Sequence, residues 1–307
     1  MTGRVVEIAE EARHLSRSRG FLIVSDGDGE LGRVPLDDID AIVVTARAAS
    51  YSNSLVAECA VRGIPLVVCG ANFAPVAWLW PIEGHHTQGQ RLRQQLEAGK
   101  PLKKRLWQYL VQAKIRQQAA ALEAVGKPGG ALVDLAGKVR SGDPDNKEAQ
   151  AARRYWTPLM GRGFRRDPSA GGANALLNYG YAVLRSAVAR SIVASGLHPT
   201  VAVFHANRSN AFALADDLLE PVRPFVDLQV HRLIAQGETS VSREAKLTLA
   251  RILSLDVETA RGITPLKTAI LRAAQSLAES FATGEPRLEL PPPQRPLFLR
   301  GGKGEAE

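Results

Sequence analysis

The character of the sequence changes at residues 78–84, which read Trp78-Leu79-Trp80-Pro81-Ile82-Glu83-Gly84. Before this stretch, short apolar runs alternate with turn residues, a pattern typical of β-strands. After it, from Gln88 onward, Gln, Arg, Leu, Ala and Lys dominate long segments without Pro or Gly, which favours helices. We therefore expect an α+β protein. A small β-rich N-terminal domain (1–80) and a linker (81–90) would precede a larger all-α C-terminal domain (91–290).

The N-terminal part contains several short apolar runs of strand length. We expect strands over 5–8, 20–24, 39–44 and 66–69, and a helix over 52–61. The sequence Asp26-Gly27-Asp28-Gly29 predicts a tight hairpin turn, because Asp-Gly readily adopts the positive φ angles that such a turn requires. Cys59 and Cys69 lie in apolar surroundings, which favours buried structural roles.

The C-terminal part predicts a series of helices. Their expected ranges are 89–98, 102–124, 130–140, 146–156, 172–195, 210–219, 226–235, 242–253 and 257–282. Within 102–124, apolar side chains share one face, and Lys103, Lys104, Lys114 and Arg116 are expected to point outward. The segment 291–307 is rich in Pro and Gly and predicts a flexible tail.

Composition excludes several classes of protein. The chain has 307 residues, 45% of them hydrophobic and 23% charged, and contains only two cysteines. It is therefore not a disordered, collagen-like or disulfide-stabilised chain. No apolar run approaches the roughly 20 residues needed to span a bilayer, and the N-terminus does not read as a signal peptide. We expect a cytoplasmic protein without a membrane partner.

The positive charge is concentrated in one quarter of the chain. Residues 1–90 have a net charge of −4, whereas residues 91–166 contain 17 basic and 6 acidic side chains, a net charge of +11. Such a concentration is the electrostatic signature of a polyanion partner, and we favour nucleic acid. The basic side chains that we expect to contact DNA are Lys103, Lys104, Arg105, Arg153, Arg154, Arg165 and Arg166.

Acidic residues and a histidine gather between residues 205 and 227. If 210–219 is helical, Asp216 and Asp217 lie on the same face as Glu220, at spacings of four and three residues. A divalent cation would relieve the repulsion between such carboxylates. Oxygen ligands favour Mg²⁺ or Mn²⁺, and a histidine ligand favours Mn²⁺. The alternative is a solvated helix face neutralised by Arg223. Glycine-rich nucleotide-binding motifs and a nucleophile elbow are absent from the sequence.

Three motifs together resemble one known family. They are Glu148-Ala149 with Ala151-Ala152 and Tyr155-Trp156, then Asn174 to Asn178-Tyr179-Gly180-Tyr181, and His205 with the run from Ala215 to Pro224. In this combination the sequence resembles CRISPR-associated protein one, the integrase of CRISPR spacer acquisition, and is most similar to the short members of type II systems. The resemblance covers nearly the whole chain.

The resemblance implies a metal-dependent DNA integrase or endonuclease that joins 3′-hydroxyl ends of short duplexes to the CRISPR repeat by transesterification. It implies that Glu148, His205 and Glu220 are the catalytic residues and the ligands of Mg²⁺ or Mn²⁺. Many members carry Asp at the position of Glu220, so Asp217 either supports the ligands or replaces Glu220 among them. The implied partners are double-stranded DNA (the incoming fragment and the repeat), a second copy of the chain and the small second adaptation subunit. We assign dimerisation to the N-terminal domain.

Three other functions remain compatible with the sequence. A metallonuclease acting on branched DNA would use the same acidic site. A non-enzymatic DNA-binding assembly subunit would use the acids only in salt bridges. An RNA-binding helical protein is the third, although no single-strand RNA-recognition motif is present. Tyr155 and Trp156 either stack on a splayed base or pack inside the protein, and packing is favoured for Trp156.

Overall fold

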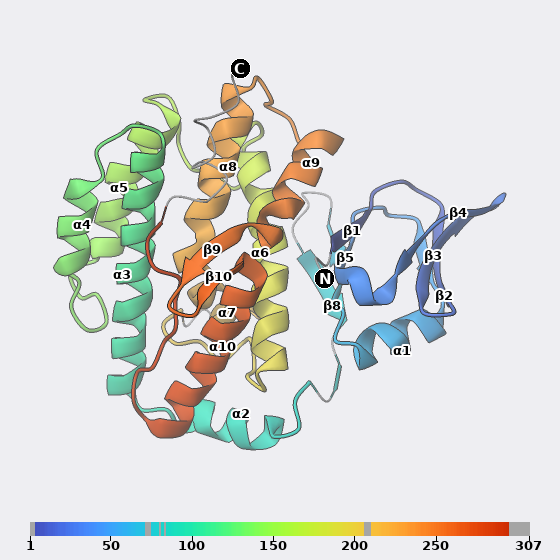
Figure 1. Ribbon diagram of the computed structural model, residues 1–307, viewed down its shortest axis with the longest axis horizontal. Helices are drawn as coiled ribbons and strands as arrows, with labels where there is room; N and C mark the ends of the chain where they lie inside the picture. Colours follow the sequence, from blue (N-terminus) through green and yellow to red (C-terminus); the bar gives the residue numbers. More distant parts are fainter. Residues whose placement is uncertain (1–3, 71–74, 80, 83, 206–209, 295–307) are drawn as a thin grey trace. The chain divides into compact units, whose positions relative to one another are not determined.

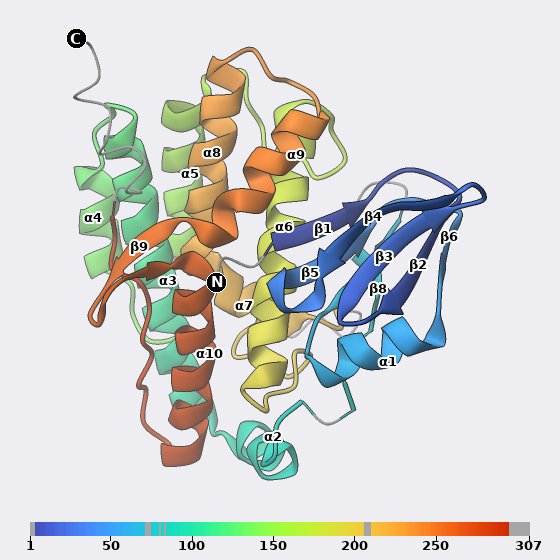
Figure 2. The same cartoon turned by 45° about the vertical axis from the view of Figure 1, so that its right-hand side comes forward.

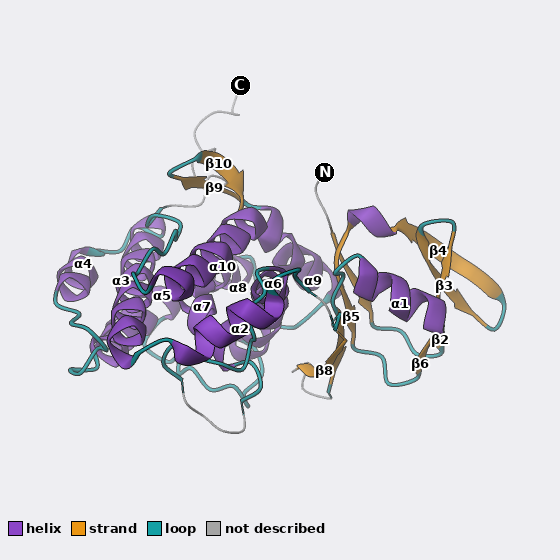
Figure 3. Ribbon diagram, turned by 90° about the horizontal axis from the view of Figure 1, so that it is seen from below, coloured by secondary structure: helices purple, strands orange, loops and turns teal. Residues whose placement is uncertain are grey.

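The computed structural model describes residues 4–70, 75–79, 81–82, 84–205 and 210–294. The chain forms two compact units, Met1–His86 and Thr87–Glu307, which we call the N-terminal unit and the helical unit. Figure 3 shows that strands dominate the N-terminal unit and helices dominate the other. This is the α+β class expected from the sequence. No helix within the described ranges is long and apolar enough to cross a membrane.

Two four-stranded sheets make up most of the N-terminal unit (Figure 1). Their strands are β1 (Arg4–Ile8), β2 (Arg13–Ser18), β3 (Phe21–Asp26), β4 (Gly29–Pro35), β5 (Ile39–Val44), β6 (Ala49–Tyr51), β7 (Leu66–Cys69) and β8 (Pro75–Leu79). One sheet has the order β1-β5-β7-β8 and the other β4-β3-β2-β6. The predicted hairpin is confirmed between β3 and β4. Strands β2, β6 and β8 were not expected. The sequences of β2 and β6, Arg-His-Leu-Ser-Arg-Ser and Ala-Ser-Tyr, lack an apolar run of strand length, whereas the apolar β8 was missed.

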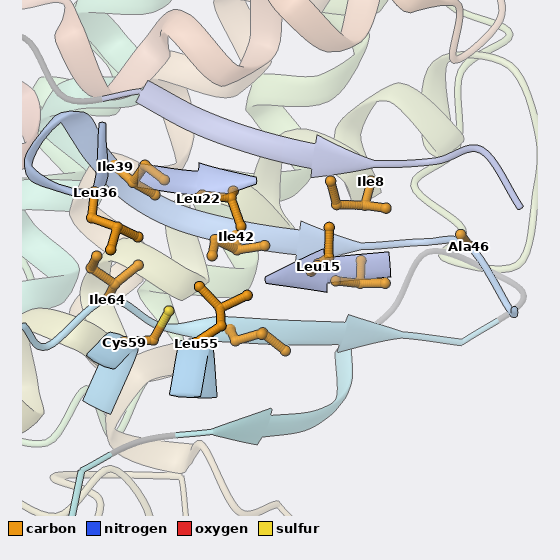
Figure 4. Packing of buried hydrophobic residues seen from close by; sticks show 12 residues of the cluster. Ile8, Leu15, Leu22, Leu36, Ile39, Ile42, Ala46, Leu55, Cys59 and Ile64 are labelled. Carbon is orange, nitrogen blue, oxygen red and sulfur yellow. The ribbon is translucent and has the colours of Figure 1, made fainter. Parts of the chain in front are cut away.

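The helix α1 (Asn53–Val61) closes the core of the N-terminal unit, as predicted. Ser52 caps it by accepting a hydrogen bond from the backbone N–H of Leu55. Leu55 and Cys59, one turn apart, are fully buried. They pack with side chains from the strands of both sheets and from the segments that connect them. Figure 4 labels Ile8, Leu15, Leu22, Leu36, Ile39, Ile42, Ala46 and Ile64 of this cluster, which also contains Val44 and Leu66.

The helical unit contains nine α-helices among its described residues. They are α2 (Gln88–Glu97), α3 (Lys100–Ala124), α4 (Gly130–Gly137), α5 (Lys147–Met160), α6 (Ala173–Ala194), α7 (Ala213–Leu219), α8 (Arg223–Ala235), α9 (Arg243–Ala250) and α10 (Leu266–Thr283). Short 3₁₀ turns, η2 (Glu220–Val222) and η3 (Arg251–Ser254), follow α7 and α9. The long α6, yellow in Figure 2, contacts α7, α8, α9 and α10.

The expectation of an all-α C-terminal domain with a helix over 257–282 is wrong for its first residues. Strands β9 (Asp256–Thr259) and β10 (Gly262–Pro265) form an antiparallel hairpin, and the helix α10 begins only at Leu266. Gly262 has a φ of +97° at the turn, a conformation that glycine adopts without strain. Pro265 cannot donate a backbone hydrogen bond and so favours a helix start directly after it.

The start of the expected flexible tail is also ordered. Pro291 and Gln294 are buried, and Gln294 exchanges hydrogen bonds with the backbone of Glu258 and with the Gln117 side chain. Residues 291–294 therefore pack against the helical unit, because the amide groups of Gln294 find partners on β9 and α3. The remainder of the predicted tail, 295–307, lies outside the described residues.

Gly180 explains how α6 and α8 come close together. A Cβ atom at this position would lie 2.5 Å from Cγ1 of Val226, closer than any real contact. A larger residue would force the two helices apart. The approach places Tyr181, the next residue of α6, beside Asp227 of α8.

Candidate functional site

Lys114 of α3 connects two carboxylates that are far apart in the sequence. Its Nζ lies 2.6 Å from Oε1 of Glu148 on α5 and 2.5 Å from Oε2 of Glu220 on η2. The side chains of Lys114 and Glu220 are only 12% and 8% exposed, and that of Glu148 is 22% exposed. The structure therefore brings two of the predicted site residues together around one buried positive charge.

The position of Glu148 is set by the way α5 begins. Asn146 adopts a left-handed conformation and caps the helix through the backbone N–H of Ala149. The carboxylate of Asp143 accepts the backbone N–H groups of Lys147 and Glu148, at 2.8 and 3.0 Å. Since four unpaired N–H groups at a helix start need acceptors, these two caps fix where Glu148 leaves the backbone.

Two cations keep the buried Glu220 ionised. Besides Lys114, Nε of Arg223 lies 2.9 Å from Oε1 of Glu220. Burial alone would raise the pKa of Glu220, but the charges of Arg223 and Lys114 outweigh it and hold that pKa below its usual value. Burial likewise opposes the charge on Lys114, and Glu220 and Glu148 together raise the pKa of the lysine.

Asp217 fixes the third predicted residue, His205. Its fully buried carboxylate accepts the backbone N–H groups of Val203, Phe204 and His205, and Oδ1 lies 2.5 Å from Nδ1 of His205. This hydrogen bond raises the pKa of His205 against the effect of burial, and the charges of Glu220 and Glu148 add to it. His205 is therefore within electrostatic reach of both carboxylates that Lys114 bridges.

The donor set suits a hard divalent cation. Because the carboxylate of Asp217 can only accept, Nδ1 of His205 carries the proton in the neutral ring and Nε2 has a free lone pair. A histidine that donates its other ring nitrogen to a carboxylate is the usual arrangement of a metal ligand. Oxygen ligands from Glu148 and Glu220 favour Mg²⁺ or Mn²⁺. In the described part of the chain, no three His, Cys, Asp or Glu side chains are already grouped closely enough to hold a metal. Lys114 supplies the positive charge between the carboxylates instead.

One expectation about this site is wrong. Lys114 was expected on the outer face of its helix, but it points inward because it continues the four-residue spacing of the buried Leu102, Leu106 and Leu110. That spacing was the signal that could have identified Lys114 from the sequence. Asp216, four residues before Glu220, pairs with Arg185 and accepts a hydrogen bond from the side-chain amide of Asn210.

A second buried polar cluster lies beside the first and was not expected. Asp227 accepts hydrogen bonds from the hydroxyls of Tyr155 and Tyr181. Burial raises the pKa of Asp227 to about 6, although both tyrosine hydroxyls oppose this shift. Tyr155 is fully buried, so it is not available to stack on a base. Trp156 contacts Phe164, with ring centroids 5.3 Å apart.

The basic residues expected to contact DNA fall into two groups. Most are exposed or half-exposed on the first turns of α3, on α5 and in the loop that follows α5: Lys103, Lys104, Arg105, Arg153, Arg154 and Arg165. Arg166 is different, because it donates to the side-chain oxygens of Asn174 and Asn178 at 2.9 and 2.7 Å. Its guanidinium also lies over the ring of Tyr181. Arg166 thus ties a loop to α6.

Comparisons with known sequences agree on one family. The family model described as "CRISPR associated protein Cas1" matches residues 6–251. A protein of Neisseria meningitidis serogroup C (strain 8013), named CRISPR-associated endonuclease Cas1, is 41% identical over 225 residues, which is 73% of each chain.

Comparisons of structures support the same fold. A chain described as "Casposase bound to integration product" superposes with a TM-score of 0.79 at 18% identity, covering 93% of this chain and 92% of the other. A chain of a "Cas6-RT-Cas1--Cas2 complex" gives a TM-score of 0.75 at 16% identity, covering 96% of this chain but 36% of the larger one.

Proposed function

This chain belongs to the CRISPR associated protein Cas1 family, and from that premise we propose that it is a metal-dependent DNA integrase and endonuclease of CRISPR adaptation. Its reaction joins the 3′-hydroxyl ends of short duplexes to the CRISPR repeat. The observation that carries the proposal is that Lys114 joins Glu148 and Glu220 from two separate segments of the helical unit, and that both carboxylates raise the pKa of His205 on a third.

The joining step is a transesterification at phosphorus. The oxygen of the incoming 3′-hydroxyl forms a new bond to the scissile phosphorus, and the bond from phosphorus to the old 3′-oxygen breaks. The proton of the attacking hydroxyl ends on the leaving oxygen, so the number of phosphodiester bonds is unchanged. When bound, Mg²⁺ or Mn²⁺ would stabilise the charge that builds on the attacking and leaving oxygens.

The residues of this chain prepare the site for that step. Glu148, Glu220 and Nε2 of His205 would hold the metal. Asp217 keeps the imidazole in the required tautomer and anchors the backbone that carries it. Arg223 keeps Glu220 ionised and oriented within a buried site.

A strand-joining assay in Mn²⁺ tests the proposal. We expect Glu148→Gln, His205→Ala and Glu220→Gln each to lower joining by more than about 100-fold, since loss of a ligand exceeds the 10–100-fold cost of losing a supporting group. Combining them should add little, because each already removes the metal site. Asp216→Asn is the matched control and should stay active, because Asp216 pairs with Arg185. Near-normal joining by His205→Ala would show that the imidazole is not a ligand.

Asp217→Asn should have an intermediate effect. We expect a loss of about 10–100-fold in joining, because Asp217 orients His205 but contacts the metal only through it. If Asp217→Asn abolished joining while Glu220→Gln remained active, Asp217 rather than Glu220 would be the third metal ligand.

One observation favours a second candidate, a DNA-binding assembly subunit without catalytic activity. Glu220 already has two cationic partners, Lys114 and Arg223, which is how a purely structural carboxylate is held. The absence of any Mn²⁺-dependent cutting or joining by the intact chain would support this candidate. Cleavage of branched DNA without joined product would instead indicate a nuclease.

DNA binding is proposed for the basic surface formed by the start of α3. Charge reversal of Lys103, Lys104 and Arg105 should weaken binding of unrelated duplexes equally, because phosphate contacts carry no sequence information. It should also flatten the salt dependence, since log K falls by about 0.9 per tenfold rise in salt for each phosphate neutralised. If log K depended on salt equally in the triple variant and the unchanged chain, these three side chains would not contact DNA phosphates.

The partners remain proposals as well. We propose that the N-terminal domain dimerises the chain, because two DNA ends must be joined at two separate phosphates by two active sites. The small second adaptation subunit would join this dimer, just as Cas1 and Cas2 occur together in the similar Cas6-RT-Cas1--Cas2 complex. Light scattering should give about twice 33.1 kDa for the full chain, and deletion of 1–80 should return it to a monomer. A truncated chain that remains dimeric would place the contact in the helical unit.

A further inference from the structure

The helical unit contains a cavity whose lining residues are separate from those of the proposed active site. It has a volume of about 490 Å³ and is lined by Arg91 of α2, Arg261 between β9 and β10, Arg272 of α10, and Arg287 beyond α10. Helices α2 and α10 contact each other, and Figure 1 shows α10 running toward α2. None of the lining residues is Glu148, His205, Asp217 or Glu220.

Two of these arginines have no acidic partner among the described residues. Arg261 pairs with Glu289 at 2.7 Å and Arg287 with Glu285 at 2.9 Å. By contrast, Arg91 donates to the backbone oxygen of Ser195, and Arg272 to the hydroxyl of Thr259, both neutral acceptors. Neither of these two guanidinium groups is therefore paired with a carboxylate among the described residues, although Glu279 and Glu289 also line the cavity. Guanidinium groups suit phosphate geometrically.

Two buried polar atoms at the same wall lack partners within the described part of the chain. Ser195 is 1% exposed, and its Oγ makes no hydrogen bond; the same holds for the buried Oε1 of Glu289. Buried polar atoms are almost always hydrogen-bonded, so each unpaired atom requires an explanation. A bound molecule that accepts from Ser195 and donates to Glu289 would satisfy both.

We propose that this cavity binds a nucleoside monophosphate. Arg91, Arg272 and the hydroxyl of Ser195 provide donors for three acceptor oxygens. A phosphomonoester has three terminal oxygens, whereas a carboxylate has only two, so the phosphomonoester matches this set of donors better. A sugar hydroxyl or a base N–H then donates to Oε1 of Glu289. The volume lies within the range of about 300–1,000 Å³ typical of small-molecule sites. The nucleotide is either free in solution or the 5′-phosphorylated end of a DNA strand.

Calorimetry with deoxyadenosine 5′-monophosphate tests the proposal, with EDTA present to exclude metal-mediated binding. The intact chain should bind it saturably, and deoxyadenosine at least about tenfold more weakly, since a charged hydrogen bond contributes about 1.5–3 kcal/mol. Arg272→Gln should weaken binding about tenfold or more. Two control variants should bind the nucleotide as tightly as the unchanged chain. They are Arg243→Gln, which changes an exposed arginine outside the cavity, and Glu148→Gln. The proposal would be overturned if the chain bound nucleotide and nucleoside with equal affinity, or if Arg272→Gln bound the nucleotide as tightly as the unchanged chain.

Ser195→Ala keeps the test valid should the arginine variant fold poorly. Removing an unpaired buried hydroxyl does not destabilise the chain, so a loss of nucleotide affinity, about three- to tenfold, reports on binding. Unchanged affinity would count against the proposal. Duplexes with and without a 5′-phosphate then identify the source. If only the phosphorylated duplex displaces the bound nucleotide, the natural ligand is a DNA end. If neither duplex displaces it, the natural ligand is a free nucleotide. Equal displacement by both would mean ordinary backbone binding and would refute the pocket.

Discussion

Two buried carboxylates in the helical unit, Glu220 and Asp227, are held in opposite ways. Glu220 lies between two cations, Lys114 and Arg223. Their charges outweigh burial and lower its pKa below the usual value, so this acid is ionised at neutral pH.

Asp227 has neutral partners instead, the hydroxyls of Tyr155 and Tyr181. Hydrogen bonds from neutral donors compensate burial only in part, and the pKa of Asp227 rises to about 6. These hydroxyls tie together α5, α6 and α8. Burial alone therefore does not decide whether an acid is ionised, because the charge of its partners counts as well.

Removing Lys114 should cause the largest loss of stability. Lys114→Met leaves Glu148 and Glu220 facing each other without the shared cation, and loss of one partner of a buried ion pair costs about 3–5 kcal/mol. Urea unfolding should show this loss. Lys104→Met, an exposed lysine of the same helix, should change stability by no more than about 0.5 kcal/mol.

A second substitution checks the cause. Adding Glu148→Gln to Lys114→Met should recover part of the loss, because Glu148 loses its cationic partner in Lys114→Met, whereas Glu220 keeps Arg223. Mn²⁺ should also stabilise Lys114→Met more than the unchanged chain, because we propose that a divalent cation binds between these carboxylates. A double variant less stable than Lys114→Met would show that the lysine acts through its packing rather than its charge.

The fold was largely predictable because its signals are local. Apolar runs and Asp-Gly turns mark strands such as β3 and β5, and long periodic segments mark helices such as α3 and α6. The hairpin β9–β10 was missed because each of its strands has only four residues and adjoins a long helix.

The site was predictable only through the family resemblance. Spacing alone grouped Asp216 with Glu220, whereas the structure pairs Asp216 with Arg185. Lys114 and Asp227 were missed because their partners come from distant helices, and no local pattern encodes which side chains meet in the interior.

Neutralising Asp227 should produce the next largest effect, as a change in pH dependence. The folded chain holds a proton on Asp227 up to about pH 6, whereas the unfolded chain releases it near the ordinary value of 3.8. Stability from this group is therefore complete below about pH 4 and declines as pH rises to about 6, by roughly 3 kcal/mol. Asp227→Asn should lack this decline in urea unfolding between pH 4 and 7. An identical pH profile in the variant would show that Asp227 titrates normally. The stability contributed by Glu220 depends on pH in the opposite direction. It is present above the pKa that Glu220 has in the unfolded chain, and it is lost as pH falls through the lower pKa of the folded chain.

Removing one tyrosine hydroxyl should cost the least stability and should test the part that neutral hydrogen bonds play at Asp227. Tyr155→Phe deletes the hydrogen bond of 3.0 Å to Oδ2 of Asp227 but keeps the buried ring. We expect a loss of about 1 kcal/mol, typical of a single hydrogen bond. Because this hydroxyl favours the ionised carboxylate, its removal should raise the pKa of Asp227 further above 6 and move the decline of stability to higher pH. Tyr109→Phe, at a tyrosine that is 47% exposed, is the matched control and should leave both quantities unchanged. A decline that moved to lower pH in Tyr155→Phe would mean that the hydroxyl favours the protonated acid, and the contrast between cation-held and tyrosine-held carboxylates would then need a different physical explanation.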